Sequence, residues 1–479
     1  MNQDNEHDMQ DHLRITIDFN HMMSDRIGSK HGITIDEIND LAETSKEIHS
    51  DLKDRREEGD LPFFDLPYNR KSIAEINEIC YTIPKDFDNF VVLGIGGSAL
   101  GGIAIQEALT NPFYNMLTKK ERKGNPRVFF ADNIDPDGFQ RLLDFVDLKK
   151  TAFNVISKSG ETAETMAQFL IVKEKLTRVL GKDAYKRHII ITTDSKKGWL
   201  REIVNREGFV SLTVPQGVGG RFSVLSEVGL LPAAVMGISI EELLAGANYM
   251  NRLCRSDCLW ENPAYMMAVL HYIACTKKGK TISIVMPYVD ALKGLADWYC
   301  QLWAESLGKK FSLDNVVINA GQTPVKALGA TDQHSQLQLY IEGPFDKVIA
   351  FIVVENYEKE VFIPPAYNDL EGVTYLGGHS LNELIKAEKV ATELALQKNQ
   401  RPNLTITLPI LNAFTLGQLF LLFELQTVFS GALYHIDPLN QPGVEQGKQF
   451  TYGLMGRKGF EAKRKDVQDS TRKNKKYII

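Results

Sequence analysis

Short apolar runs recur along the middle of this chain, and each is followed by Gly, Ser or Thr and then by a helical pattern. Strand and helix signals that alternate in this way predict parallel sheets with helices on both faces. The predicted strands fall into two sets, at residues 90–93, 128–130, 154–156, 188–192 and 210–214, and at residues 281–286, 347–354 and 404–406. The fold class is therefore α/β, with two units in series and helices such as 291–307 and 380–397 in the second.

Two segments of different character flank these units, so we expect four parts. Residues 1–65 form a polar N-terminal arm with a mostly helical pattern, 66–245 the first α/β domain and 246–456 the second. The C-terminal tail, 457–479, holds nine Lys or Arg and three Asp or Glu, a net charge of +6. We interpret it as a solvated, partly disordered end, although a basic tail can also contact an acidic partner.

Composition narrows the possible functions. With 479 residues, 43% hydrophobic and 24% charged, the chain can bury a large core. A net charge of −6 gives no reason to expect nucleic-acid binding. The apolar stretch 417–434 is interrupted by Gln and Glu, so we expect a buried helix there and no membrane partner. Five scattered cysteines and a polar start without a signal-peptide pattern favour a cytoplasmic location.

The first chemical signal is a glycine-rich turn after the strand at 90–93. Gly94, Gly96 and Gly97 precede Ser98 and a helical pattern. Glycine lets the backbone approach a ligand, and a helix N-terminus offers free N–H groups to an anion. Such turns also bind dinucleotides, but the third position after Gly96 is Ala99, which disfavours a nicotinamide cofactor.

A second strand-to-helix turn carries three hydroxyls and a cation. Ser157, Ser159 and Thr162 lie within six residues, and Lys158 stands between the serines. Hydroxyl donors, a cation and a helix N-terminus together suit a phosphate monoester. The competing interpretation is that one of these serines simply caps the helix.

Two charged residues in later segments are candidates for acid–base chemistry. Three glycines precede Arg221, and an arginine beside open backbone can stabilise an oxyanion, although a flexible surface turn fits the pattern as well. Glu305 ends a predicted helix and is a candidate general base. Its simpler interpretation is an i,i+4 ion pair with Lys309. We expect Trp298 and Trp303 to form an apolar wall that raises the pKa of Glu305.

The remaining candidates are a histidine and a lysine. His334 lies in a polar, Gly-led turn and is a candidate proton shuttle, or else a solvated loop residue. Lys448 follows a buried helix, in a segment that also contains Gln441. The histidines are scattered, with no His-Glu-x-x-His arrangement, so we expect no metal and no cofactor.

Taken in order, these segments resemble the phosphoglucose isomerase family from about residue 65 to 456. The most specific stretches are Gly-Val-Gly-Gly-Arg-Phe-Ser-Val-Leu-Ser at 217–226 and Gln-Pro-Gly-Val-Glu-Gln-Gly-Lys at 441–448, joined by Glu-Ser-Leu-Gly-Lys at 305–309 and Gly-Ala-Thr-Asp-Gln-His ending at His334. The resemblance implies two sugar-isomerase (SIS) domains, each flavodoxin-like. It implies reversible interconversion of glucose 6-phosphate and fructose 6-phosphate by a homodimer, with His334 acting in the partner's site.

The resemblance also implies a role for each candidate. His334 and Lys448 would open the sugar ring, Glu305 would move a proton between carbons 2 and 1, and Arg221 would stabilise the cis-enediolate. The sugar and phosphate contacts would be Gly97, Ser98, Ser157, Lys158, Ser159, Thr162, Thr165, Gly220 and Gln441. Two alternatives remain: a regulator that binds sugar phosphates without turnover, and an isomerase that also accepts mannose 6-phosphate.

Overall fold

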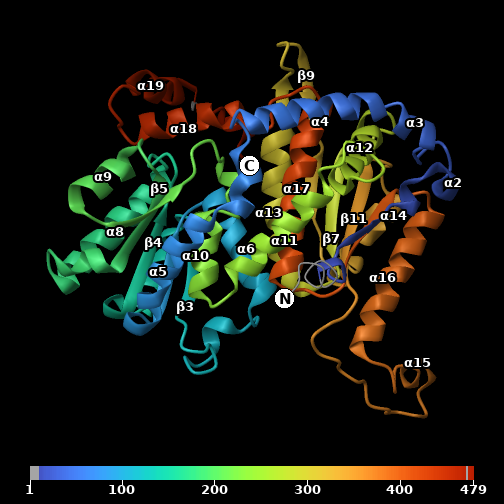
Figure 1. The fold of residues 1–479 in the computed structure, drawn as a ribbon, viewed down its shortest axis with the longest axis horizontal. Helices are drawn as coiled ribbons and strands as arrows, with labels where there is room; N and C mark the ends of the chain where they lie inside the picture. Colours follow the sequence, from blue (N-terminus) through green and yellow to red (C-terminus); the bar gives the residue numbers. More distant parts are fainter. Residues whose placement is uncertain (1–9, 471–472) are drawn as a thin grey trace.

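Two five-stranded sheets, each covered by helices, organise the computed structural model (Figure 1). The structure describes residues 10–470 and 473–479. The first nine residues of the predicted arm and residues 471–472 of the predicted tail therefore lie outside the described residues.

The first sheet is parallel throughout, with the strand order β3-β2-β4-β5-β6. All residues of β2 and β4 are buried, as the unbroken apolar runs in this part of the sequence predict. The strand order reverses between β2 and β4, which is where doubly wound sheets bind ligands. The strands are β2 (Asn89–Leu93), β3 (Arg127–Ala131), β4 (Thr151–Ile156), β5 (Ile189–Asp194) and β6 (Val210–Val214).

Helices cover both faces of this sheet, so the α/β prediction is confirmed for this half of the chain. They are α5 (Arg70–Asp86), α6 (Leu100–Leu109), α7 (Pro136–Phe145), α8 (Ala163–Leu180), α9 (Trp199–Glu207) and α10 (Glu227–Val235). Helices α6 and α8 follow directly from the turns after β2 and β4, so their N-termini point at the same edge of the sheet.

The second sheet repeats the first in its topology. Its order is β1-β12-β11-β7-β10, in which the last four strands are parallel and β1 pairs antiparallel with β12. The fifth place, filled by β6 in the first sheet, is taken here by a strand from the N-terminal arm. The mostly helical pattern of the arm gave no sign of β1. The strands are β1 (Thr16–Asp18), β7 (Ile282–Pro287), β10 (Thr323–Lys326), β11 (Lys347–Val354) and β12 (Asn403–Leu408).

Helix α17 (Ala413–Leu433) lies at the centre of the molecule and packs against α11, α12 and α13 (Figure 1). Its length and composition would let it cross a membrane, but 89% of its apolar window is buried inside the protein. The predicted buried helix is thus confirmed. The other helices outside the first α/β half are α2 (Ser24–Ile27), α3 (Ile35–Asn39), α4 (Ala42–Glu57), α11 (Ile240–Leu253), α12 (Pro263–Thr276), α13 (Lys293–Leu307), α14 (Leu337–Glu342), α15 (Glu371–Thr374) and α16 (Leu381–Lys398).

One hairpin and the two C-terminal helices lie outside the two sheets and the helices that cover them. A hairpin of β8 (Lys309–Phe311) and β9 (Val317–Ala320), absent from the predicted elements, follows α13 and projects from the molecule at the top of Figure 1. The C-terminal helices α18 (Pro442–Leu454) and α19 (Glu461–Ser470) lie against the first α/β half. Ten residues of the predicted tail form α19, none of them buried.

Candidate active site

The turns after β2 and β4 lie at the point where the strand order of the first sheet reverses. The first turn contains the 3-10 helix Gly96–Ser98, in which Ser98 is partly exposed. A Cβ on Gly97 would collide with the backbone carbonyl group of Gly220, so only glycine permits this contact. The Ser223 hydroxyl donates to the carbonyl of Gly97 (3.3 Å). The glycine-rich turn is thereby packed directly against the segment that carries Arg221.

The turn after β4 is ordered by its own hydroxyls. The Ser157 hydroxyl lies 3.0 Å from that of Thr162 and accepts the Gly160 N–H at 3.1 Å. The Ser159 hydroxyl accepts the Glu161 N–H at 3.2 Å. Neither serine caps α8: its N-cap is Thr162, whose side chain makes no capping bond. The first N–H groups of α8 are therefore open to an anion beside these hydroxyls.

Lys158 and Thr165 complete this turn. The Lys158 ammonium donates to the carbonyl of Val218 (2.7 Å) and so ties the turn to the segment before Arg221. Burial lowers the pKa of Lys158 below its usual value, with Asp194 opposing the shift. The Thr165 hydroxyl is buried and has no hydrogen-bond partner within the described residues.

Arg221 is the most connected of the predicted residues, and its side chain is only 2% exposed. Its Nε donates to the Ser306 hydroxyl (2.7 Å), and its Nη1 donates to Oε1 of Gln441 (3.1 Å). Its Nη2 donates to the carbonyls of Asn440 (3.1 Å) and Pro438. Burial lowers its pKa, but a guanidinium so shifted is still charged at neutral pH. A surface turn with a free arginine is therefore excluded.

The fifth partner of Arg221 is the carboxylate of Glu305, in the last turn of α13. Its Oε1 lies 3.3 Å from Nη1 of Arg221. Its Oε2 accepts a hydrogen bond from Nε2 of Gln301 at 3.0 Å. The ammonium of Lys309 instead donates to the backbone carbonyls of Glu305 (2.8 Å) and Ser306 (2.7 Å), where it caps the helix. The i,i+4 ion pair between the side chains of Glu305 and Lys309 does not form.

The expected tryptophan wall beside Glu305 is wrong. Trp298 is fully buried against Phe420 of α17, with ring centroids 4.9 Å apart. Trp303 is fully buried beside His271 of α12 (5.5 Å). Both indoles thus face the helical core, while the groups that contact the Glu305 carboxylate are a guanidinium and an amide.

His334 stands apart from the other candidates. Its side chain is exposed and has no partner within the described residues. Its loop, in contrast, is firmly held. Asp332 accepts the Leu328 N–H (2.7 Å) and the hydroxyl of Ser335, and the Tyr288 hydroxyl donates to Gln333 (2.6 Å). The fold therefore presents this histidine at the surface on an ordered loop, with no contact to the Glu305 carboxylate of the same chain.

Gln441 and Lys448 lie on α18. Gln441 is the N-cap residue of that helix and, as a partner of Arg221, belongs to the site. Lys448 is half-exposed and pairs with Glu445 at 2.8 Å, rather than with Glu305 or Arg221. The structure thus joins the two glycine-containing turns, the hydroxyl turn, Glu305 and Gln441, whereas His334 and Lys448 make no contact with these groups.

A comparison with known protein families identifies the family to which a chain with this site belongs. A family model described as phosphoglucose isomerase matches residues 77–473. The chain belongs to the phosphoglucose isomerase family. A glucose-6-phosphate isomerase from Carboxydothermus hydrogenoformans is 46% identical over 473 residues, covering 98% of this chain and 100% of that protein. One from Rubrobacter xylanophilus is 47% identical over 402 residues, covering 84% of this chain and 90% of that one.

Solved structures agree with the fold of this phosphoglucose isomerase family member. A hypothetical protein from Thermus thermophilus has a TM-score of 0.82 at 33% identity, covering 92% of this chain and 100% of that chain. A glucose-6-phosphate isomerase from Chlamydia trachomatis has a TM-score of 0.72 at 24% identity, with 84% and 76% covered. The prediction of a phosphoglucose isomerase from the sequence motifs is confirmed.

The sequence analysis missed one residue of this site, Gln301. It lies one helical turn before Glu305, and its amide nitrogen holds the carboxylate while its Oε1 is buried without a partner in the described part of the chain. A Cβ on Gly96 would lie 3.1 Å from that amide nitrogen. The i,i+4 spacing from Glu305 is the signal that could have found it.

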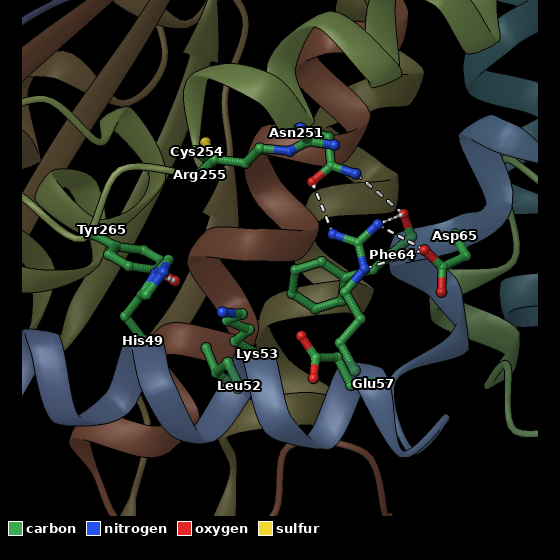
Figure 2. Close-up of a pocket in the computed structure, with 11 residues that line it drawn as sticks. His49, Leu52, Lys53, Glu57, Phe64, Asp65, Asn251, Cys254, Arg255 and Tyr265 are labelled. Atoms are coloured by element: carbon green, nitrogen blue, oxygen red, sulfur yellow. Dashed lines mark hydrogen bonds and ion pairs between the residues drawn. The ribbon is translucent and has the colours of Figure 1, made fainter.

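A separate cavity of about 600 Å³ lies between α4 on one side and α11 and α12 on the other (Figure 2). None of the predicted site residues lines it. Its central cation, Arg56, is bound by Asp65 (2.6 Å) and by the amide of Asn251 (3.4 Å). This cavity is therefore distinct from the site around Arg221.

Proposed function

We propose that this chain interconverts glucose 6-phosphate and fructose 6-phosphate through an open-chain sugar and a cis-enediolate. The observation that carries the proposal is the pairing of Glu305 with the buried Arg221 at 3.3 Å, in a segment tied by Lys158 to the hydroxyl turn. A carboxylate that removes a proton alpha to a carbonyl needs a cation where the oxyanion forms. The identity with glucose-6-phosphate isomerases supports the same reaction.

Substrate binding uses the part of the sugar that does not react. The phosphate would occupy the open N-terminus of α8 and contact the hydroxyls of Ser157, Ser159 and Thr162. Thr165 lies in the first turn of α8, and its buried hydroxyl lacks a partner within the described residues. Gly97, Ser98 and Gly220 would let the backbone lie close to the sugar. Holding the phosphate fixes carbons 1 and 2 against the base and removes most of the entropy of alignment.

Proton transfer then follows at carbons 1 and 2. Glu305 takes the proton from carbon 2 of the aldose and returns it to carbon 1, while the hydroxyl proton of oxygen 2 moves to oxygen 1. These two shifts together convert the aldose to the ketose. Gln301 holds the unpaired carboxylate oxygen, so the base keeps one orientation through both transfers. Arg221 stabilises the enediolate oxygen, and Gln441 is positioned by the same guanidinium. Ring opening before these steps would use His334 and Lys448.

We also propose a homodimer in which His334 acts in the partner's site. The outward position of this histidine on an ordered loop supports the proposal. The β8–β9 hairpin offers an apolar surface that a second copy would cover: Leu313 and Val316 are each 57% exposed, and Phe311 and Val317 about half exposed. An exposed apolar patch of this kind marks an interaction surface. Within this picture the protein is cytoplasmic and needs no membrane or nucleic-acid partner.

Complementation between two inactive variants tests the shared site. Glu305→Gln and His334→Gln subunits would each be inactive alone, whereas a statistical mixture after co-expression should recover about a quarter of wild-type activity, because half of the dimers contain one intact site. Sedimentation of Val317→Asp should show a monomer. A monomeric wild-type protein that still turns over substrate would exclude the shared site.

The reaction itself is tested by incubating the purified protein with fructose 6-phosphate and reading glucose 6-phosphate through a coupled dehydrogenase. Turnover supports the isomerase. Binding of fructose 6-phosphate without turnover would make the chain a sugar-phosphate-binding regulator.

A further inference from the structure

The C-terminal helices contact the hydroxyl turn that follows β4. In Figure 1 α18 and α19 lie on the first α/β half, although the helix before them, α17, lies at the centre of the molecule. Nη2 of Arg457 lies 3.2 Å from Oε2 of Glu161, and the Tyr452 hydroxyl donates to the Glu161 carbonyl at 3.4 Å. Glu161 lies between the predicted phosphate ligands Ser159 and Thr162, directly before Thr162. The end of the chain is thus joined directly to the phosphate-binding turn.

An aromatic cluster fixes the guanidinium of Arg457 in place. Its Cζ lies 4.5 Å from the ring centroid of Tyr452 and 5.4 Å from that of Phe460. The two rings meet edge to face, with centroids 5.3 Å apart. Stacking of this kind orients an arginine and leaves its donors free for a carboxylate. Glu161 is the only acidic partner of Arg457 among the residues that the structure describes.

Helix α18 is therefore anchored at two points. At its N-terminus Gln441 accepts from Arg221, and at its C-terminal end Tyr452 and Arg457 reach Glu161. Lys448 lies between these anchors, four residues before Tyr452 and so on the same side of the helix. Movement of the Glu161 contact would shift Lys448 relative to the sugar.

We propose that Glu161, Arg457 and Tyr452 form a latch, and that these positioning residues hold α18, and with it Lys448, against the phosphate-binding turn. The Glu161 N–H is bonded to the Ser159 hydroxyl, so a phosphate that engages this hydroxyl changes the environment of the latch. The ion pair is partly exposed, 36% for Arg457 and 40% for Glu161, which suits a contact that opens and closes. Occupancy of the turn by phosphate is thereby coupled to the placement of Lys448. The kinetic consequence rests on the proposed isomerase function.

Hydrogen–deuterium exchange of residues 442–456, measured on the full chain, tests the latch without turnover. Inorganic phosphate at saturating concentration is the probe. In the wild type, phosphate should slow exchange in α18. In Arg457→Ala the basal exchange of α18 should rise and the phosphate effect should disappear. The matched control is Lys458→Ala, which removes the neighbouring exposed cation and should behave as wild type.

Kinetics on fructose 6-phosphate supply the second readout. Glu161→Gln and Arg457→Gln should each lower kcat/KM by about two- to fivefold, the range expected for one partly exposed ion pair. The double variant should be no worse than either single variant, because the two side chains act through one contact. Additive losses, or α18 exchange in Arg457→Ala equal to wild type with and without phosphate, would overturn the latch. A wild type that never turns over substrate would instead refute the proposed isomerase, and the exchange measurement would still decide on the latch.

Discussion

Arg221 connects three segments of the site. Its replacement by lysine keeps the positive charge but removes the planar set of hydrogen-bond donors. Five acceptors surround the guanidinium: Ser306, Gln441, Asn440, Pro438 and Glu305. An ammonium has three donors, so Arg221→Lys leaves at least two of these acceptors without a partner. A buried acceptor that loses its partner costs ~1–3 kcal/mol, and since Ser306 and Pro438 are the buried acceptors here, we expect a loss of at least about 1–3 kcal/mol in unfolding free energy. That is a large part of the ~5–15 kcal/mol of a typical protein.

The variant should also lose catalytic power, since the positive charge no longer has a fixed position beside Glu305. Removing one preorganised oxyanion donor typically lowers kcat by ~10²–10³, and we expect a loss in that range. Urea unfolding followed by circular dichroism measures the first effect, and coupled turnover of fructose 6-phosphate under native conditions measures the second.

Arg401 provides the matched control. It is 5% exposed and donates to the carbonyls of Pro344 (2.9 Å), Gly343 (2.8 Å) and Ile341, and it makes no contact with the site. Arg401→Lys should therefore lower the unfolding free energy while kcat stays near wild type. The reasoning is refuted if Arg221→Lys unfolds at the wild-type midpoint with kcat within a few-fold, or if Arg401→Lys loses kcat to the same extent.

Three further changes have definite outcomes. Gly97→Ala places a Cβ against the backbone of Gly220. We therefore expect a lower thermal midpoint and weaker substrate binding, both of which calorimetry measures. An unchanged KM would show that the two turns can separate without affecting binding. Asp332→Asn weakens the acceptor of the Leu328 N–H and should lower kcat with little change in KM or unfolding free energy; equal kinetics would mean that the loop holds without this carboxylate. Burial lowers the pKa of His31 from 6.5 to about 4, with nearby cations adding to the shift. Between those values the unfolded chain binds a proton that the folded chain does not, so stability falls by about 3 kcal/mol as the pH drops from 6.5 to 4. His31→Gln should flatten that slope in urea titrations.

The central strands of the two sheets, among them β2, β4, β11 and β12, were predictable because they are mostly apolar runs buried on both faces. Strand β10 was not predicted, since its four residues are short, polar at both ends and only partly buried. Strand β1 was not predicted either, because the three residues Thr16–Asp18 have no pattern of their own and become a strand only by pairing with β12. The β8–β9 hairpin escaped prediction for a related reason: its apolar side chains face outward, so no alternation with a buried face marks it. Elements whose identity depends on a distant partner carry little local signal.

The site likewise contains residues that the sequence could predict and residues that it could not. The hydroxyl turn could be recognised from spacing, and the motifs around Arg221 and Glu305 from their resemblance to a family. The packing around Glu305 could not: Trp298 and Trp303 are close to it in sequence but face the core, while Gln301, four residues away, holds the carboxylate. On a helix surface, side chains are direct neighbours only at i,i+3 or i,i+4 spacing.

The most direct test of the account compares the wild type with Glu305→Gln in the coupled assay with fructose 6-phosphate, in the presence of a chelator. Glutamine keeps the shape of the side chain but cannot accept the proton from carbon. The account predicts turnover by the wild type, and a variant that binds fructose 6-phosphate with similar affinity but loses kcat by at least ~10². A Glu305→Gln variant with wild-type kcat would contradict the assignment of this carboxylate as the base that moves the proton between carbons 1 and 2.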